Sequence, residues 1–141
     1  MNDLKIDKDL IFEKIDLIRL SLKKLQSLQG LTPGQFALDE NFAVAEHYLR
    51  YALEAMLDIC GHILSRMPGA KIEEYKQMAL EMGKQKIVPI EFAEKRLVEM
   101  AGYRNRLTHF YFEVTPQEMY DIIQNHLDDF DTFLGHIKKL L

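Results

Sequence analysis

This 141-residue sequence contains one cysteine and no tryptophan. A single thiol, Cys60, excludes a disulfide framework and a cysteine-rich zinc site, and it is typical of a protein from a reducing compartment. No apolar run approaches the roughly 18 to 20 residues that span a bilayer, and the first ten residues lack the apolar core of a signal peptide. We therefore expect a cytoplasmic protein that makes no membrane contact.

Most sequence signatures of enzyme active sites are missing as well. The chain has no glycine-rich phosphate loop, no His-Glu-x-x-His motif and no Gly-x-Ser-x-Gly motif. A di-iron helical bundle needs Glu-x-x-His pairs, yet no glutamate stands three residues before any of the five histidines. Cys60 and His62 supply too few ligands for a metal site, so we interpret them as a buried thiol near a satisfied core histidine. The sequence thus predicts no metal and no cofactor.

The composition, 48% hydrophobic and 28% charged, is that of one globular domain, which we place at residues 1–141. Each of the four prolines falls between segments that are rich in helix formers. No segment shows the strict alternation of apolar and polar residues that indicates a strand. The expected fold class is therefore all-α.

Apolar residues at spacings of three and four predict the individual helices. The clearest segment follows Thr115-Pro116-x-Glu118, a typical helix start, and predicts one helix over 116–141. Four further apolar stripes predict helices over 11–25, 42–63, 71–82 and 89–103. The helix over 42–63 is apolar on more than one face, so we expect it at the centre. Short connections between them indicate an antiparallel up-and-down bundle of four to five helices.

One stretch carries reactive side chains at a suggestive spacing. Arg104 falls in register with Ala93, Leu97 and Met100, so a helix would direct its guanidinium along an apolar face. Because arginine is rarely buried unpaired, a carboxylate, a cleft or a subunit interface must meet it. His109 follows about one and a half turns later. Spacing alone leaves open both an anion-binding pair and a structural arginine in a salt bridge.

The pattern Arg104-x4-His109-x-Tyr111, with Asn105 directly after the arginine, resembles the signature of HEPN-domain ribonuclease toxins. The resemblance is greatest to the HepT type, the partners of MNT-type nucleotidyltransferase antitoxins. Residues 48–62 are similar to the second helix of that family, and residues 114–120 to the entry to its last helix. The resemblance covers nearly the whole chain and implies an HEPN-like helical bundle.

The resemblance also implies a function: a homodimeric toxin of a type II toxin–antitoxin system that cleaves RNA without a metal. The RNA 2′-hydroxyl would attack its own phosphate and leave a 2′,3′-cyclic end. His109 suits the proton transfers, because histidine changes charge near neutral pH, and Arg104 suits the phosphate oxygens. Two copies facing each other would supply both an acid and a base. Asn105 would support the site, or merely form hydrogen bonds at the helix terminus.

For Tyr111 the resemblance implies modification, since MNT-type antitoxins transfer AMP to the tyrosine of this motif. The alternative interpretation of Tyr111 is an aromatic side chain that packs at the end of the helix. A second alternative concerns the whole chain: a non-catalytic HEPN partner or substrate-binding module of a nucleotidyltransferase. A plain helical adaptor, with Arg104 in a salt bridge, is the third interpretation.

The net charge of −4 disfavours a nonspecific nucleic-acid binder. Between Lys84 and Arg106, however, six basic residues face three acidic ones, a local charge of +3. We take Lys84, Lys86 and Arg106 as possible RNA contacts in this strip. The other interpretation of the strip is a solvated helix face.

Overall fold

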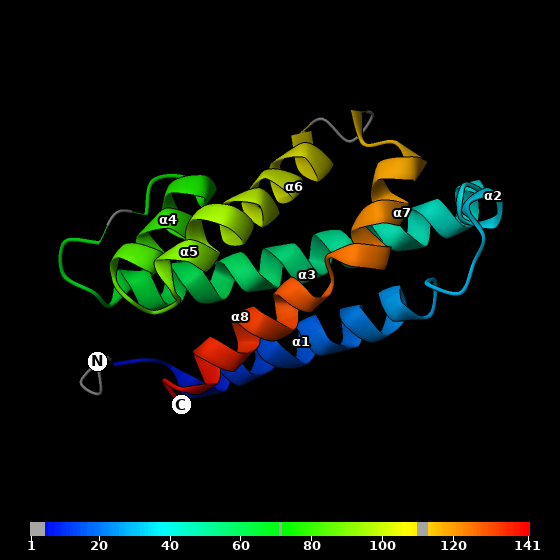
Figure 1. Cartoon of the computed structure of the whole chain (residues 1–141). Coiled ribbons are helices and arrows are strands. Elements are labelled where there is room, and N and C mark those ends of the chain that lie inside the picture. The colour runs from blue at the N-terminus through cyan, green and yellow to red at the C-terminus, as the bar shows by residue number, and fades with distance from the viewer. Residues whose placement is uncertain (1–4, 71, 110–112) are drawn as a thin grey trace.

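The computed structural model describes residues 5–70, 72–109 and 113–141, which form helices and contain no strand (Figure 1). The helices are α1 (Lys8–Gln26), α2 (Pro33–Phe36), α3 (Asp39–Ser65), α4 (Tyr75–Lys84), α5 (Ile90–Phe92), η1 (Ala93–Leu97), α6 (Val98–His109), α7 (Pro116–Asn125) and α8 (Asp128–Lys138). Among the described residues, no helix is long and apolar enough to cross a membrane.

The predicted antiparallel bundle is confirmed, with α3 at its centre. α1 and α3 form the most extensive helix pair, and α4, α6 and α7 also contact α3. Figure 1 shows α8 beside α1 on one side of α3, and α4 and α6 on the other. Every apolar residue of the α1 stripe predicted from the sequence is buried, and eleven residues of α3 are buried. Alanines such as Ala45 and Ala52 allow neighbouring helices to approach α3 closely.

The prediction of one helix over 116–141 is wrong, because the chain bends at His126 and Leu127 between α7 and α8. His126 has φ −127° and ψ 6°, outside the helical region, and its ring lies 3.0 Å from an Arg96 nitrogen. The bend lets α7 lie across α2 and α3 while α8 runs beside α1 (Figure 1). Asp128, Asp129 and Asp131 then stabilise the new helix N-terminus.

Two other boundaries also differ from the prediction. The helix expected over 71–82 begins at Tyr75 and continues to Lys84. The helix expected to end near residue 103 continues to His109, and it includes the wide π-helical turn η1. Arg104 and His109 therefore lie on one continuous helical segment with Ile90 at its start.

Gly83 allows α4 to pack closely against α5 and η1. A Cβ atom at this position would lie 2.7 Å from the Ala93 Cβ and 2.8 Å from the Ile90 Cδ1. No other residue fits without moving one of the two helices. α4 also contacts α6, the helix that carries Arg104 and His109. The close approach at Gly83 therefore fixes the position of α4 relative to α6.

Candidate functional site

A hollow of about 640 Å³ lies between the start of α4 and the C-terminal half of α6. Arg104, Asn105 and His109 line it from α6, and Tyr75 and Met78 line it from α4. The structure thus brings the three site residues expected within α6 to one cavity. Tyr111 lies outside the described residues.

Arg104 is held against an aromatic ring and is only loosely paired. Its Cζ atom lies 4.4 Å from the centre of the Tyr75 ring, a distance at which a guanidinium is attracted to the ring face. Its Nε lies 4.0 Å from Oε1 of Glu54 on α3, and it is buried without a hydrogen-bond partner among the described residues. The side chain is 17% exposed. Arg104 therefore carries an unsatisfied Nε donor beside the hollow that it lines.

His109 is the last residue of α6, and it is exposed where it lines the hollow. At 1.5 Å of rise per residue, its backbone stands about 7.5 Å along the helix from that of Arg104. Both residues nevertheless line the same hollow. Asn105 is partly buried and adds an amide to the same lining.

Arg106 points to a different part of the molecule. Both of its terminal nitrogens donate to the Glu118 carboxylate on α7, and the Nη2–Oε2 distance is 2.8 Å. The hydrogen bonds to Glu118 raise the pKa of Arg106. Arg106 lines a separate hollow with Tyr103 and His126, and it is not part of the lining that Arg104 shares with His109.

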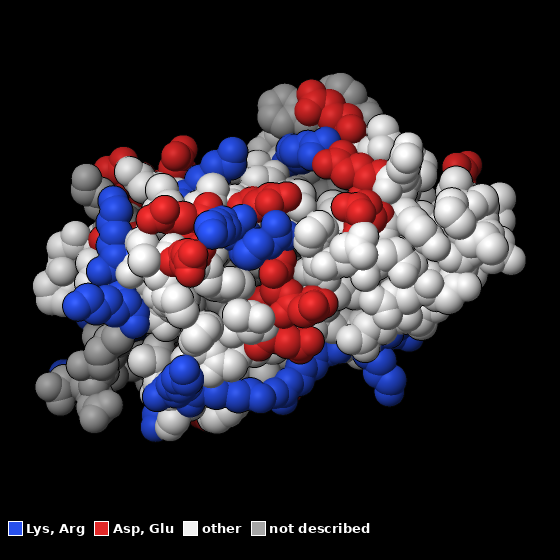
Figure 2. Space-filling view, in the orientation of Figure 1, with Lys and Arg blue, Asp and Glu red and all other residues white. Residues whose placement is uncertain are grey.

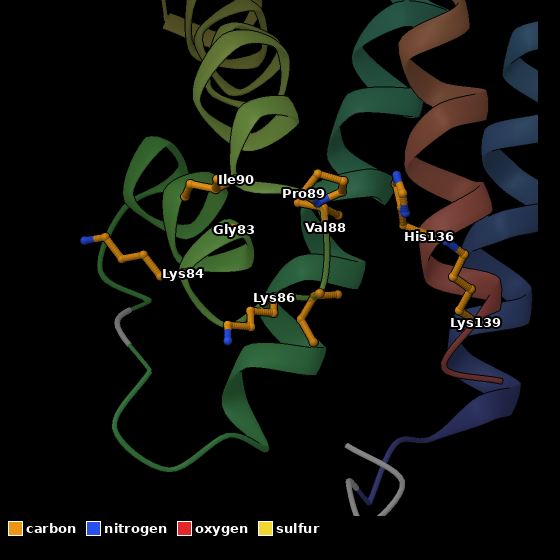
Figure 3. A pocket seen from close by; sticks show the side chains of 9 residues that line it. Gly83, Lys84, Lys86, Val88, Pro89, Ile90, His136 and Lys139 are labelled. Carbon is orange, nitrogen blue, oxygen red and sulfur yellow. The ribbon is translucent and has the colours of Figure 1, made fainter.

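The structure does not bring Lys84 and Lys86 to the motif either. Tyr75 begins α4 and Lys84 ends it, so the two are separated by about 13 Å along the helix. Lys84 and Lys86 line a hollow of their own with residues of α8 (Figure 3).

Much of the predicted basic strip is neutralised by neighbouring carboxylates. Lys95 pairs with Glu91 at 3.2 Å, and Arg96 pairs with Glu99 at 2.9 Å and with Asp129 at 2.8 Å. Figure 2 shows acidic and basic side chains interspersed over this face. The local charge of +3 therefore does not form one continuous basic surface.

Sequence reasoning missed Tyr75 and Glu54, the two residues that hold Arg104. No local pattern marks Tyr75, because its role depends on how α4 packs against α6. Glu54 lies in the segment that resembles the family's second helix, but its spacing carries no sign of a partner 50 residues away.

The interpretation of Cys60 as a buried thiol is confirmed, whereas His62 has a hydrogen-bond partner but is only partly buried and is not a core residue. Cys60 is fully buried, and burial raises the pKa of its thiol. His62 Nε2 accepts a hydrogen bond of 3.0 Å from the backbone N–H of Asp7. In the part of the chain that the structure describes, no three His, Cys, Asp or Glu side chains are grouped so that they could hold a metal ion.

A family model described as Ribonuclease HepT-like matches residues 18–137. The chain is 26% identical over 137 residues to the tRNA nuclease HepT of Aphanizomenon flos-aquae, which covers 96% of this chain and 92% of that protein. It is 29% identical over 133 residues to the mRNA nuclease HepT of Shewanella oneidensis, covering 92% and 97% of the two chains.

A solved structure is similar over the same range. The tri-AMPylated HEPN toxin of Shewanella oneidensis, in complex with its MNT antitoxin, superposes with a TM-score of 0.83. The match covers 93% of this chain and 98% of that chain at 26% identity. A second structure, a toxin–antitoxin with AMP-PNP, gives a TM-score of 0.81 at the same coverage and identity.

Proposed function

Because this chain belongs to the HepT-like ribonuclease family, we propose that it is an endoribonuclease toxin that acts in the cytoplasm as a homodimer. The observation that carries the proposal is the hollow that Arg104, with an unsatisfied Nε donor, lines together with His109. The similarity to proteins named tRNA nuclease and mRNA nuclease supports RNA as the substrate.

The proposed reaction is an internal phosphoryl transfer. A base takes the proton of a ribose 2′-hydroxyl, the 2′-oxygen bonds to the adjacent phosphorus, and the bond from phosphorus to the 5′-oxygen breaks. An acid protonates the leaving 5′-oxygen, so the products are a 2′,3′-cyclic phosphate and a 5′-hydroxyl end. The reaction written in this way is complete without a co-reactant or a metal.

This chain's residues fit the steps of that reaction. His109 transfers a proton, a contribution of typically ~10²–10⁴-fold in rate. Arg104 donates hydrogen bonds to the non-bridging phosphate oxygens as charge builds on them. The Asn105 amide orients the phosphate. One chain offers one such histidine, so a second copy across a two-fold axis supplies the other proton-transfer group.

The test is cleavage of single-stranded RNA by the purified protein, with and without EDTA. We expect the same rate in both conditions and a 2′,3′-cyclic phosphate in the product. His109→Ala should abolish cleavage while the helical circular dichroism and the dimer in sedimentation remain. Cleavage that vanishes in EDTA or survives the substitution would refute the mechanism. No cleavage by the unaltered protein would favour the non-catalytic partner module.

We also propose that a partner antitoxin controls the activity of the nuclease. In the proposed scheme a nucleotidyltransferase antitoxin transfers AMP from ATP to the Tyr111 hydroxyl, and pyrophosphate leaves. Tyr111 lies two residues beyond His109 in the sequence, so the added phosphate would repel RNA near the site. The tri-AMPylated toxin of Shewanella oneidensis supports this form of control.

Mass spectrometry after co-expression with the antitoxin tests the modification. The adduct is expected on the peptide that contains Tyr111, and Tyr111→Phe should escape covalent silencing. Tyr103 and Tyr120 should stay unmodified, because their hydroxyls donate to Glu99 at 2.6 Å and to the Leu31 carbonyl at 2.8 Å. A fully neutralised toxin without an adduct would instead indicate inhibition by complex formation.

A further inference from the structure

The hollow that Lys84 and Lys86 line, of about 560 Å³, lies at the end of α4 opposite to the one near Arg104 and His109 (Figure 3). Every ionisable residue in its lining is basic: Lys84 and Lys86 from the end of α4, and His136 and Lys139 from the end of α8. Neither Lys84 nor Lys86 makes an ion pair with another described residue, unlike Lys95 and Arg96 in the same strip. The hollow therefore concentrates positive charge that the protein leaves uncompensated.

The backbone at Lys86 is a second, independent sign of function. Lys86 has φ 61°, the one non-glycine residue with positive φ in the described ranges. It occupies the position after the helix C-cap where glycine is usual: its N–H bonds to the Gly83 carbonyl at 3.0 Å, and the next N–H bonds to the Met82 carbonyl at 3.0 Å. A side chain is unfavourable here, and Lys86 is exposed, so packing does not explain it.

The floor of the hollow is apolar, formed by Val88, Pro89 and Ile90 between the two groups of basic residues (Figure 3). The His136 ring stands at its edge, and burial together with the charge of Lys139 lowers the pKa of His136. Burial and the neighbouring charge thus both favour the neutral ring. A neutral ring and an apolar floor offer a stacking surface for a planar group.

We propose that this hollow is an RNA exosite, in which Lys84, Lys86 and Lys139 bind backbone phosphates and the floor beside His136 receives a base. The inference rests on the proposed ribonuclease function and extends its substrate contacts. Ammonium groups bind phosphates as point charges, and an apolar floor fits a nucleobase better than it fits the carboxylates of an acidic protein surface. RNA is therefore favoured over an acidic protein partner.

The two hollows lie at opposite ends of α4, so the length of this helix sets the shortest RNA that can reach both. The ends of α4 are about 13 Å apart, which corresponds to about four stacked nucleotides at ~3.4 Å each. A dinucleotide is too short to reach both hollows, whereas an oligonucleotide of about 12 residues can do so. We therefore expect the exosite to contribute to binding of the long oligonucleotide and not to binding of the dinucleotide.

Binding is measured on full-length protein in the His109→Ala background, so that cleavage does not interfere. The probes are fluorescein-labelled single-stranded oligouridylate of about 12 nucleotides and the dinucleotide UpA. Lys86→Gly should weaken binding of the long probe about fivefold at 0.1 M salt, because it removes one phosphate contact. Combining it with Lys84→Gln and Lys139→Gln should weaken binding about 100-fold and reduce the salt slope by about 2. Binding of UpA should not change.

The Lys86→Gly variant also distinguishes an effect on RNA binding from an effect on folding stability. Glycine suits the positive φ, so the thermal midpoint should stay or rise by up to about 3 °C while RNA binding falls. The matched control is Lys24→Gln, which removes an exposed charge from the last turn of α1 and should leave RNA binding intact. Unchanged binding of the long probe in the triple variant would overturn the exosite.

Two further outcomes are diagnostic. If poly-L-glutamate competes as well as polyuridylate at equal charge, the hollow is a general acidic-surface site and the RNA assignment fails. Cleavage by the His109-intact protein is measured on the same long probe. If that protein does not cleave but the lysine variants still lose binding, the ribonuclease proposal fails and the exosite stands. If it cleaves and the variants bind normally, the exosite alone fails.

Discussion

Arg104 and Arg106 lie two residues apart on α6, yet they point into different environments. Arg106 meets Glu118 in a two-pronged ion pair, with both side chains 34% exposed. Arg104 rests on the Tyr75 ring, with its closest described carboxylate oxygen 4.0 Å away and its Nε unsatisfied. The same side chain type is thus fully paired on one face of the helix and underpaired on the other.

This difference in pairing indicates which of the two arginines has a structural role. A buried donor without a partner costs about 1–3 kcal/mol, so folding alone does not favour the arrangement at Arg104. A phosphate in the hollow would offer the guanidinium an anion in addition to Glu54, which is 4.0 Å away. Arg106 already has its anion within the chain, so we expect it to join α6 to α7 rather than to contact RNA.

The largest expected effect is on cleavage, when each arginine is replaced by lysine. Arg104→Lys keeps the charge but loses the planar pair of donors, so we expect the rate to fall ~10²–10³-fold. Arg106→Lys should change the rate by less than about tenfold. Initial rates on single-stranded RNA measure both, and equal losses would remove the distinction between the two arginines.

A substitution far from both arginines should disturb the Arg104 environment selectively. Gly83→Ala forces α4 away from α5, so we expect a loss of about 1–3 kcal/mol in unfolding free energy. It should also shift Tyr75 and reduce cleavage, while the ion pair of Arg106 stays in place. Urea unfolding and cleavage rates test this. Gly135→Ala, where a Cβ meets nothing within 4 Å, is the control and should not destabilise the protein.

The smallest expected effect concerns the two carboxylates. Glu118→Gln should lower the unfolding free energy by about 1 kcal/mol, since it weakens a partly exposed ion pair with good geometry. Glu54→Gln should lower it by less than about 0.5 kcal/mol, because Glu54 is 40% exposed and 4.0 Å from its arginine. Urea titration compares the two. A larger loss at Glu54 would show that Arg104 is held mainly by its carboxylate and not by the Tyr75 ring.

The sequence predicts the parts of this molecule that depend on local periodicity. The stripes of α1 and α3 are regular, and α3 is central as its apolar faces indicate. The bend at His126 escaped prediction because apolar spacing continues across it, and the contact of its ring with Arg96, thirty residues away, leaves no local signal in the sequence. The acidic run that begins at Asp128 was the local signal of a new helix start.

The residues of the candidate site also divide into those that local sequence spacing groups correctly and those that only the packing of the helices reveals. Arg104, Asn105 and His109 share one helix, so their spacing in the sequence was sufficient to group them. Lys84 and Lys86 were grouped with them by closeness in the sequence, but α4 is antiparallel to α6 and carries them to the other end of the motif helix. Tyr75 reaches Arg104 for the same reason, and only the packing of the two helices reveals it.

The π-helical turn at Ala93–Leu97 has a consequence for how the length of this chain can vary. A π turn accommodates one residue more than an α-helix of the same rise. Deleting one residue within it would restore regular winding and leave the downstream helix in its orientation. A deletion between Val98 and Arg104 would instead rotate the motif by about 100°. Single-residue deletions that preserve the nuclease motif should therefore accumulate at Ala93–Leu97.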